Sequence, residues 1–112
     1  MKIAVPLSQG RLSPHFGHAE VFAIVEADRE GRRVLGTELH HPPAHEPGAL
    51  PRWLAGLGVE VILASGMGMR AQQFFAQFGI EVVVGLPAEA PERLVQGLLD
   101  GTLEAGQNVC DH

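Results

Sequence analysis

Two short apolar runs with a helical segment between them place the strongest constraint on the fold of this chain. Residues 59–64 (VEVILA) and 80–84 (IEVVV) are continuous, partly β-branched and of strand length. The intervening segment is predicted as a helix with one apolar face made of Met69, Phe74, Phe75 and Phe78. Strands joined through a helix lie parallel, with a right-handed crossover. Because parallel strands are buried on both faces, the chain needs helices on both sides of its sheet.

The first forty residues add strands that are not separated by helices. Lys2–Leu7, Val21–Ala27 and Arg33–His40 are predicted as strands, and the turn at 28–32 (DREGR) joins the last two as a hairpin. A hairpin brings an antiparallel strand into the sheet. The sequence therefore predicts an α/β fold, a three-layer α/β/α sandwich around a five-stranded mixed sheet.

Two further helices and two irregular segments complete the predicted organisation. A short helix ends at Gly58, and the last helix spans Pro87–Leu99. The segment 41–51 (HPPAHEPGALP) contains four prolines, which forbid a regular ladder or helix, and is expected to be a mobile surface loop. Residues 101–112 carry no core pattern and are expected to form a flexible tail. The apolar positions of the two helices are Leu50, Trp53, Leu54 and Leu57, then Leu94, Val95, Leu98 and Leu99.

Length and composition favour one globular domain over residues 1–112, with 46% hydrophobic and 19% charged residues. The net charge is -5 and the basic residues are scattered, which argues against nucleic acid as a partner. No apolar run approaches the roughly 20 residues that span a bilayer, so no membrane association is expected. The single cysteine cannot form an internal disulfide. A cytoplasmic protein is expected.

Three loops are predicted to meet where the parallel strands end, which is where open α/β sheets bind ligands. They are residues 8–18, 65–70 and 85–89. In the second loop, Ser65, Gly66, Met67 and Gly68 open a helix, whose free N–H groups attract anions. This turn alone is a weak signal, because it is neither a Walker loop nor a full GxGxxG fingerprint.

Histidines are the sharper indication, since all six fall in loops or at element ends. His15 and His18 bracket Phe16 and Gly17 in the first loop, while His112 follows Cys110 by two residues. Imidazole and thiolate are ligands of soft and borderline metals. The role of His40, His41 and His45, which crowd the proline-rich segment, stays open. A closed zinc site lacks four ligands at familiar spacings.

Catalysis finds no support in the motifs. The chain has no GxSxG elbow, no Cys–His arrangement with an orienting partner and no carboxylate pair that the pattern brings together. The protein is therefore expected not to be an enzyme.

Four segments carry a resemblance to a known family: MKIAVPL, then SPHFGHAEVFAIVE, then SGMG after an apolar strand, and NVCDH at the end. The chain resembles the dinitrogenase iron-molybdenum cofactor biosynthesis family, the NifX- and NafY-like group that includes the molybdenum-copper orange protein. The resemblance implies a ribonuclease-H-like sandwich with strand order 3-2-1-4-5 and strand 2 antiparallel. It also implies a non-catalytic carrier of an Fe-S, Mo-Fe-S or Mo-Cu-S cluster.

By position, the resemblance assigns both cofactor-binding residues and metal ligands. Amides of Gly66–Met69 would solvate a sulfide-rich anion, and apolar side chains beside them would exclude water. The cofactor-binding set is His15, Phe16, Gly17, His18, Ser65, Gly66, Met67 and Gly68, and the metal ligands are His15, Cys110 and His112.

Two other functions stay open from the sequence. The chain could be an interaction module that docks on a metalloenzyme or a cluster-assembly protein without binding metal itself. It could also bind phosphorylated metabolites at the SGMG turn, although that turn lacks the Walker Lys and Ser/Thr.

Overall fold

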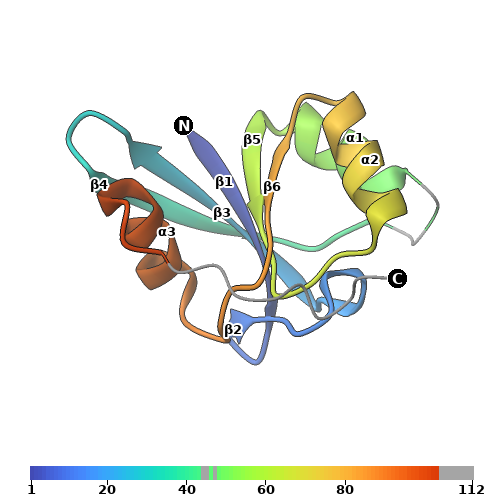
Figure 1. Cartoon of the computed structure of the whole chain (residues 1–112), viewed down its shortest axis with the longest axis horizontal. Coiled ribbons are helices and arrows are strands. Elements are labelled where there is room, and N and C mark those ends of the chain that lie inside the picture. The colour runs from blue at the N-terminus through green and yellow to red at the C-terminus, as the bar shows by residue number, and fades with distance from the viewer. Residues whose placement is uncertain (44–45, 47, 104–112) are drawn as a thin grey trace.

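The computed structural model describes residues 1–43, 46 and 48–103. The first half of the chain forms strands, and strands and helices alternate in the second half, as predicted (Figure 1). In chain order the elements are β1 (Lys2–Ser8), β2 (Arg11–Leu12), the 3₁₀ turn η1 (Phe16–His18), β3 (Val21–Asp28), β4 (Arg33–His40), α1 (Ala49–Gly56), β5 (Val59–Leu63), α2 (Met69–Gln77), β6 (Glu81–Val83) and α3 (Pro91–Asp100).

One mixed sheet runs through the molecule in the order β4-β3-β1-β5-β6. β3 is antiparallel to both β1 and β4, whereas β1, β5 and β6 are mutually parallel. The mixed α/β prediction is therefore confirmed. The ribonuclease-H-like classification stays a prediction.

The expected count of five strands is wrong, because β2 pairs with the end of β1 as a sixth strand. Leu12 lies opposite Leu7, and the tight turn between them places both Gln9 and Gly10 at positive φ, 55° and 80°. Two central residues with positive φ make the turn that suits a two-residue hairpin. The sequence indicated only a loop at Gln9 and Gly10, because the strand that follows this turn, β2, is just two residues long.

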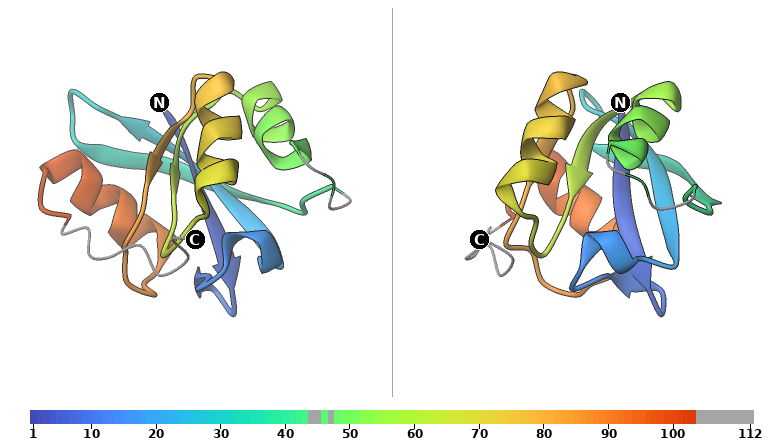
Figure 2. Two further views of the ribbon diagram at one scale, coloured as in Figure 1. Left: turned by 45° about the vertical axis from the view of Figure 1, so that its right-hand side comes forward. Right: turned by 90° about the vertical axis from the view of Figure 1, so that its right-hand side faces the viewer.

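Helices cover both faces of the sheet, as predicted (Figures 1 and 2). Ile3 and Val5 of β1 point to the side of α3, where they pack with Leu94 and Val95. Ala4, between them in the strand, faces the other side, where α1 and α2 supply their buried residues. Because successive residues of a strand point to opposite faces, β1 contributes to both cores.

The predicted apolar face of α2 is wrong in composition. Only Phe75 is fully buried, while Met69 is 52% and Phe78 40% exposed. At 3.6 residues per turn, Met69 lies about 120° around the helix from Phe75, so these residues cannot share one narrow face. The core contact of α2 therefore depends on one aromatic ring.

The last helix begins later than predicted. Pro91 is its first residue, where the missing N–H costs nothing and the fixed φ suits a helix. Gly101 ends it at a φ of 72°. Leu94 and Val95 are fully buried, and Leu98 and Leu99 pack against the same core.

The described start of the expected tail also contacts the core. Leu103 packs against the cluster under α3, where a Cβ on Gly97 would come within 2.9 Å of its Cδ2. Residues 104–112 lie outside the described part of the chain.

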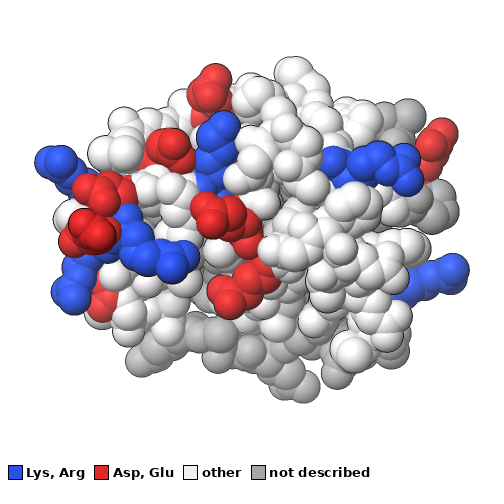
Figure 3. Space-filling view, turned by 90° about the horizontal axis from the view of Figure 1, so that it is seen from above, with Lys and Arg blue, Asp and Glu red and all other residues white. Residues whose placement is uncertain are grey.

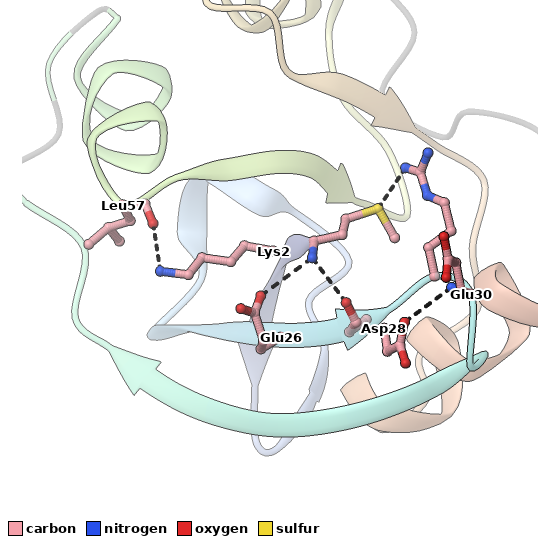
Figure 4. Close-up of polar contacts among 8 residues, drawn as sticks. Lys2, Glu26, Asp28, Glu30 and Leu57 are labelled. Carbon is pink, nitrogen blue, oxygen red and sulfur yellow. Dashed lines mark hydrogen bonds and ion pairs between the residues drawn. The ribbon is translucent and has the colours of Figure 1, made fainter.

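Polar contacts fasten the first residues of β1 to their neighbours (Figure 4). The Lys2 ammonium donates a hydrogen bond of 3.1 Å to the Leu57 carbonyl at the end of α1 (Figure 4). A cation there complements the negative end of the helix dipole. The Met1 amino group donates to the Ala27 carbonyl at 3.0 Å and lies 3.6 Å from a Glu26 carboxylate oxygen.

Viewed from above, acidic and basic side chains are intermixed on one half of the surface, and the other half is largely uncharged (Figure 3). This face therefore has no extended field of one sign. Within the described residues, no helix is long and apolar enough to cross a membrane.

Candidate functional site

A groove opens on the α1–α2 side of the sheet, next to the loop that follows β2. It has a volume of about 880 Å³. Its lining comes from residues 15–18, from Met67 and Gly68, and from the beginnings of α1 and α2. Two of the three loops predicted to converge therefore meet in one concave surface.

The first loop is held by Ser13, the one polar residue with a buried side chain in the described part of the chain. Its hydroxyl donates to the His15 carbonyl at 2.8 Å and accepts the His15 N–H at 3.2 Å. Its own N–H donates to the Pro6 carbonyl of β1 at 2.8 Å. Ser13 thus connects the loop to the sheet and fixes the position of the His15 backbone.

The two histidines of the first loop stand close together at the groove. The ring centroids of His15 and His18 are 6.0 Å apart with the planes at 75°, and both side chains are exposed. The His18 N–H donates to the His15 carbonyl at 3.0 Å, which closes the 3₁₀ turn between them. Phe16, inside that turn, is half-buried and packs against Phe75 of α2. The turn therefore presents two imidazoles next to the packed rings of Phe16 and Phe75.

The second loop contributes only its last two residues to the groove. Met67 is fully buried and Gly68 is partly exposed, and both line it. Gln72 of α2 donates through Nε2 to the Met67 carbonyl at 2.8 Å, and its N–H donates to the Gly68 carbonyl at 3.1 Å. One side chain of the helix thereby fixes the turn that precedes it.

Ser65 and Gly66 do not line the groove. The Ser65 hydroxyl donates to the Leu86 carbonyl at 2.8 Å, and the Ser65 carbonyl accepts the Gly85 N–H at 2.9 Å. These bonds hold the third predicted loop against the second. The segment 85–89 thus supports the site from behind without lining it.

Cys110 and His112 lie outside the described residues, as does His45. Among the described residues, no three His, Cys, Asp or Glu side chains are grouped as a metal site. The ring of His40 lies 6.4 Å from that of Trp53 in an edge contact, and neither His40 nor His41 lines the groove.

Several residues of the site were not singled out from the sequence. Arg70, Glu46 and the apolar first turn of α1 line the groove, and Ser13 and Gln72 hold its loops. The Ser-Pro pair at 13–14 was a turn signal that could have identified Ser13. Nothing comparable marks Arg70, because its place follows from how α2 packs.

Comparison with known families gives a match over residues 1–101 to the family described as "Dinitrogenase iron-molybdenum cofactor". The chain belongs to the dinitrogenase iron-molybdenum cofactor family. The resemblance drawn from the HFGHA, SGMG and other segments is thereby confirmed.

Two known proteins align with parts of this chain. An uncharacterized protein of Methanocaldococcus jannaschii is 36% identical over 109 residues, which are 93% of this chain and 90% of that protein. The FeMo cofactor biosynthesis protein NifB of Sinorhizobium fredii is 32% identical over 76 residues, 63% of this chain but only 15% of NifB.

Solved structures show the same fold. The crystal structure of the protein PH0822 superposes with a TM-score of 0.84 at 29% identity, covering 94% of each chain. The apo form of the orange protein from Desulfovibrio gigas gives a TM-score of 0.77 at 26% identity, covering 96% of this chain and 93% of that one.

Proposed function

We propose that this protein is a non-catalytic carrier that holds a metal-sulfur cluster in the groove beside His15 and Met67. The observation that supports it most is the meeting of residues 15–18 with Met67 and Gly68 along one groove. These segments are about fifty residues apart in the sequence, and both carry the family resemblance. The cargo class is that of the family, an Fe-S, Mo-Fe-S or Mo-Cu-S cluster.

The chemistry of the groove suits a sulfide-rich anion. Imidazoles of His15 and His18 offer a ligand or a hydrogen-bond donor at its mouth. The first N–H groups of α2 have no carbonyl of a preceding turn to bond, and they direct partial positive charge outward. Apolar side chains, Phe16 and Met67 among them, keep water away and strengthen both interactions.

The remaining ligands would come from the end of the chain. Cys110 and His112 are proposed to join His15 as metal ligands, because a thiolate and an imidazole two residues apart can bind one soft metal. Thiolate binding releases a proton, so loading would weaken in acid. Ser65 and Gly66 do not line the groove, so of the SGMG turn only Met67 and Gly68 are proposed as contacts with the cluster.

The partners we propose are a metalloenzyme or a cluster-assembly protein that donates or receives the cluster. The relatives support this class by name, since one is a FeMo cofactor biosynthesis protein. No step of bond making or breaking is assigned to the chain itself, because carriage requires only binding and release.

Anaerobic reconstitution tests the carrier function. The purified metal-free protein is incubated with iron and sulfide, or with tetrathiomolybdate and copper, and then desalted. Retention of a visible chromophore with a fixed metal-to-protein ratio is expected. Loss of all colour and metal on desalting, from a protein with an unchanged circular dichroism spectrum, would contradict the proposal.

A docking module without its own metal is the second candidate, and the edge strand β4 supports it. Leu35 and Leu39 of β4 are 58% and 64% exposed, so this edge strand presents apolar side chains that a partner could cover. A pull-down of the assembly partner with metal-free and loaded protein separates the two functions. Capture that ignores loading favours the module, and capture that depends on loading favours the carrier.

A further inference from the structure

The groove is lined by two side chains of fixed charge, Arg70 in α2 and Glu46 in the segment before α1. Arg70 lies in the first turn of α2, and Glu46 precedes α1, where its carbonyl accepts the Ala49 N–H at 3.0 Å. Most of the other side chains around them, such as Phe74 and Leu50, are apolar. The electrostatic potential inside the groove therefore depends mainly on Arg70 and Glu46.

The positive charge of Arg70 does not stabilise α2, because it lies at the N-terminal end of the helix. A cation in the first turn opposes the helix dipole, at a cost that an acidic residue would avoid. Within residues 1–43, 46 and 48–103, no carboxylate pairs with its guanidinium, since the ion pairs there involve Met1 with Glu26 and Arg33 with Asp28. Neither helix stability nor a salt bridge within the described residues accounts for this arginine.

We propose that Arg70 makes the groove select its cargo by negative charge, with Glu46 as an opposing charge that limits the strength of binding. This inference rests on the proposed carrier function and adds the residue that decides specificity. The guanidinium and the first amides of α2 act with the same sign on an anion in the groove. Glu46 repels the same anion from the side of α1, which favours its release to a partner.

Arginine suits this role because its charge is permanent. The guanidinium stays protonated at any physiological pH and is weakly hydrated, so it loses little when an anion displaces water from it. Its charge acts more strongly beside apolar groups than in open water. A neutral ligand of the same size gains nothing from it.

The test measures binding of tetrathiomolybdate, a coloured dianion, to the full chain by equilibrium dialysis at low and high salt. Arg70→Gln is expected to weaken binding roughly tenfold to a hundredfold, the range for losing a hydrogen bond to a charged group. It should also flatten the salt dependence. Glu46→Gln is expected to tighten binding about threefold.

Two further variants separate charge from general damage. Arg52→Gln removes the same charge from an exposed site on α1 outside the groove, and should leave binding within about twofold. Arg70→Lys should recover most of the affinity, because the proposal concerns charge. Removing Arg70 should not unfold the chain, and a thermal melt checks this.

The outcomes distinguish this inference from the carrier function. If the natural chain binds tetrathiomolybdate and Arg70→Gln binds it equally well, the inference is wrong and the carrier function stands. It is also wrong if Arg70→Lys is as weak as Arg70→Gln. If the natural chain binds neither tetrathiomolybdate nor reconstituted clusters, both proposals fail together.

Discussion

The ring of Phe16 meets the ring of Phe75 edge to face, with centroids 6.1 Å apart and planes at 67°. Phe16 belongs to the first loop and is half-buried, whereas Phe75 belongs to α2 and is fully buried. Such pairs add about 0.5–1.5 kcal/mol to the burial of the rings. The contact joins the histidine-bearing turn to the core, so the shape of the groove depends on how that core is packed.

Replacement of Phe75 by alanine should destabilise the protein by about 3–5 kcal/mol, because it leaves a cavity in the core and removes the support of Phe16. Urea denaturation measures the free energy of unfolding. The control is Phe78→Ala at the C-cap of the same helix, where the side chain is 40% exposed and the cost should be about 1 kcal/mol or less. Equal losses in the two variants would contradict the view that α2 is held by Phe75.

Loss of the Ser13 hydroxyl should loosen the first loop. Ser13→Ala removes the two partly buried hydrogen bonds between the Ser13 hydroxyl and the His15 backbone, at a cost of about 0.5–1.5 kcal/mol for each bond. Hydrogen exchange at the His15 amide should accelerate. Ser8→Ala is the matched control, since the Ser8 hydroxyl makes only an exposed bond to Glu20, and it should change stability by about 0.5 kcal/mol or less. An unchanged His15 exchange rate in Ser13→Ala would show that the loop is held by other contacts.

The groove histidines should control retention of the chromophore. His15→Ala and His18→Ala are each expected to lower cluster affinity, by about tenfold for a lost ligand or its hydrogen bond, after the anaerobic loading described above. His41→Ala, at an exposed site outside the groove, should retain the full chromophore. Equal retention by all three variants would remove imidazole from the proposed binding set.

Gln72 should stabilise the turn that carries Met67 and Gly68. Gln72→Met keeps helix propensity and size but removes the 2.8 Å bond to the Met67 carbonyl, at an expected cost of about 0.5–1.5 kcal/mol. Gln73→Met, next to it on an exposed part of α2, is the control and should be nearly neutral. The free energy of unfolding is measured for both variants. If Gln72→Met costs no more than Gln73→Met, the Gln72 side chain does not stabilise the turn.

Much of the fold could be predicted because its strongest patterns are local. The bounds of β4 were predicted as Arg33–His40, and β3 differs from its prediction by only one residue. The errors arose where local pattern is ambiguous. β2 is too short to show alternation, and the apolar residues of α2 are spread so widely around the helix that the sequence did not identify Phe75 as the buried one.

The candidate site was predicted in part for a related reason. The HFGH turn and the Met67–Gly68 turn were expected at the same sheet edge, because β1 and β5 are parallel and their carboxyl ends point toward that edge. Arg70 and Glu46 were missed because a charged residue in a helix turn or a loop looks like ordinary solvent-facing surface until its neighbours in space are known.

The sequence by itself determined the alternation of strands and helices and the two loop motifs, because hydrophobic period and turn chemistry act over a few neighbouring residues. The resemblance of its motifs indicated the family. Only the tertiary structure decided that Phe75 carries the core contact of α2, that Ser65 supports the groove without lining it, and that Arg70 and Glu46 line the same concave surface. Those relationships depend on the angle at which helices pack on a twisted sheet, which is set by the summed contacts of residues far apart in the chain.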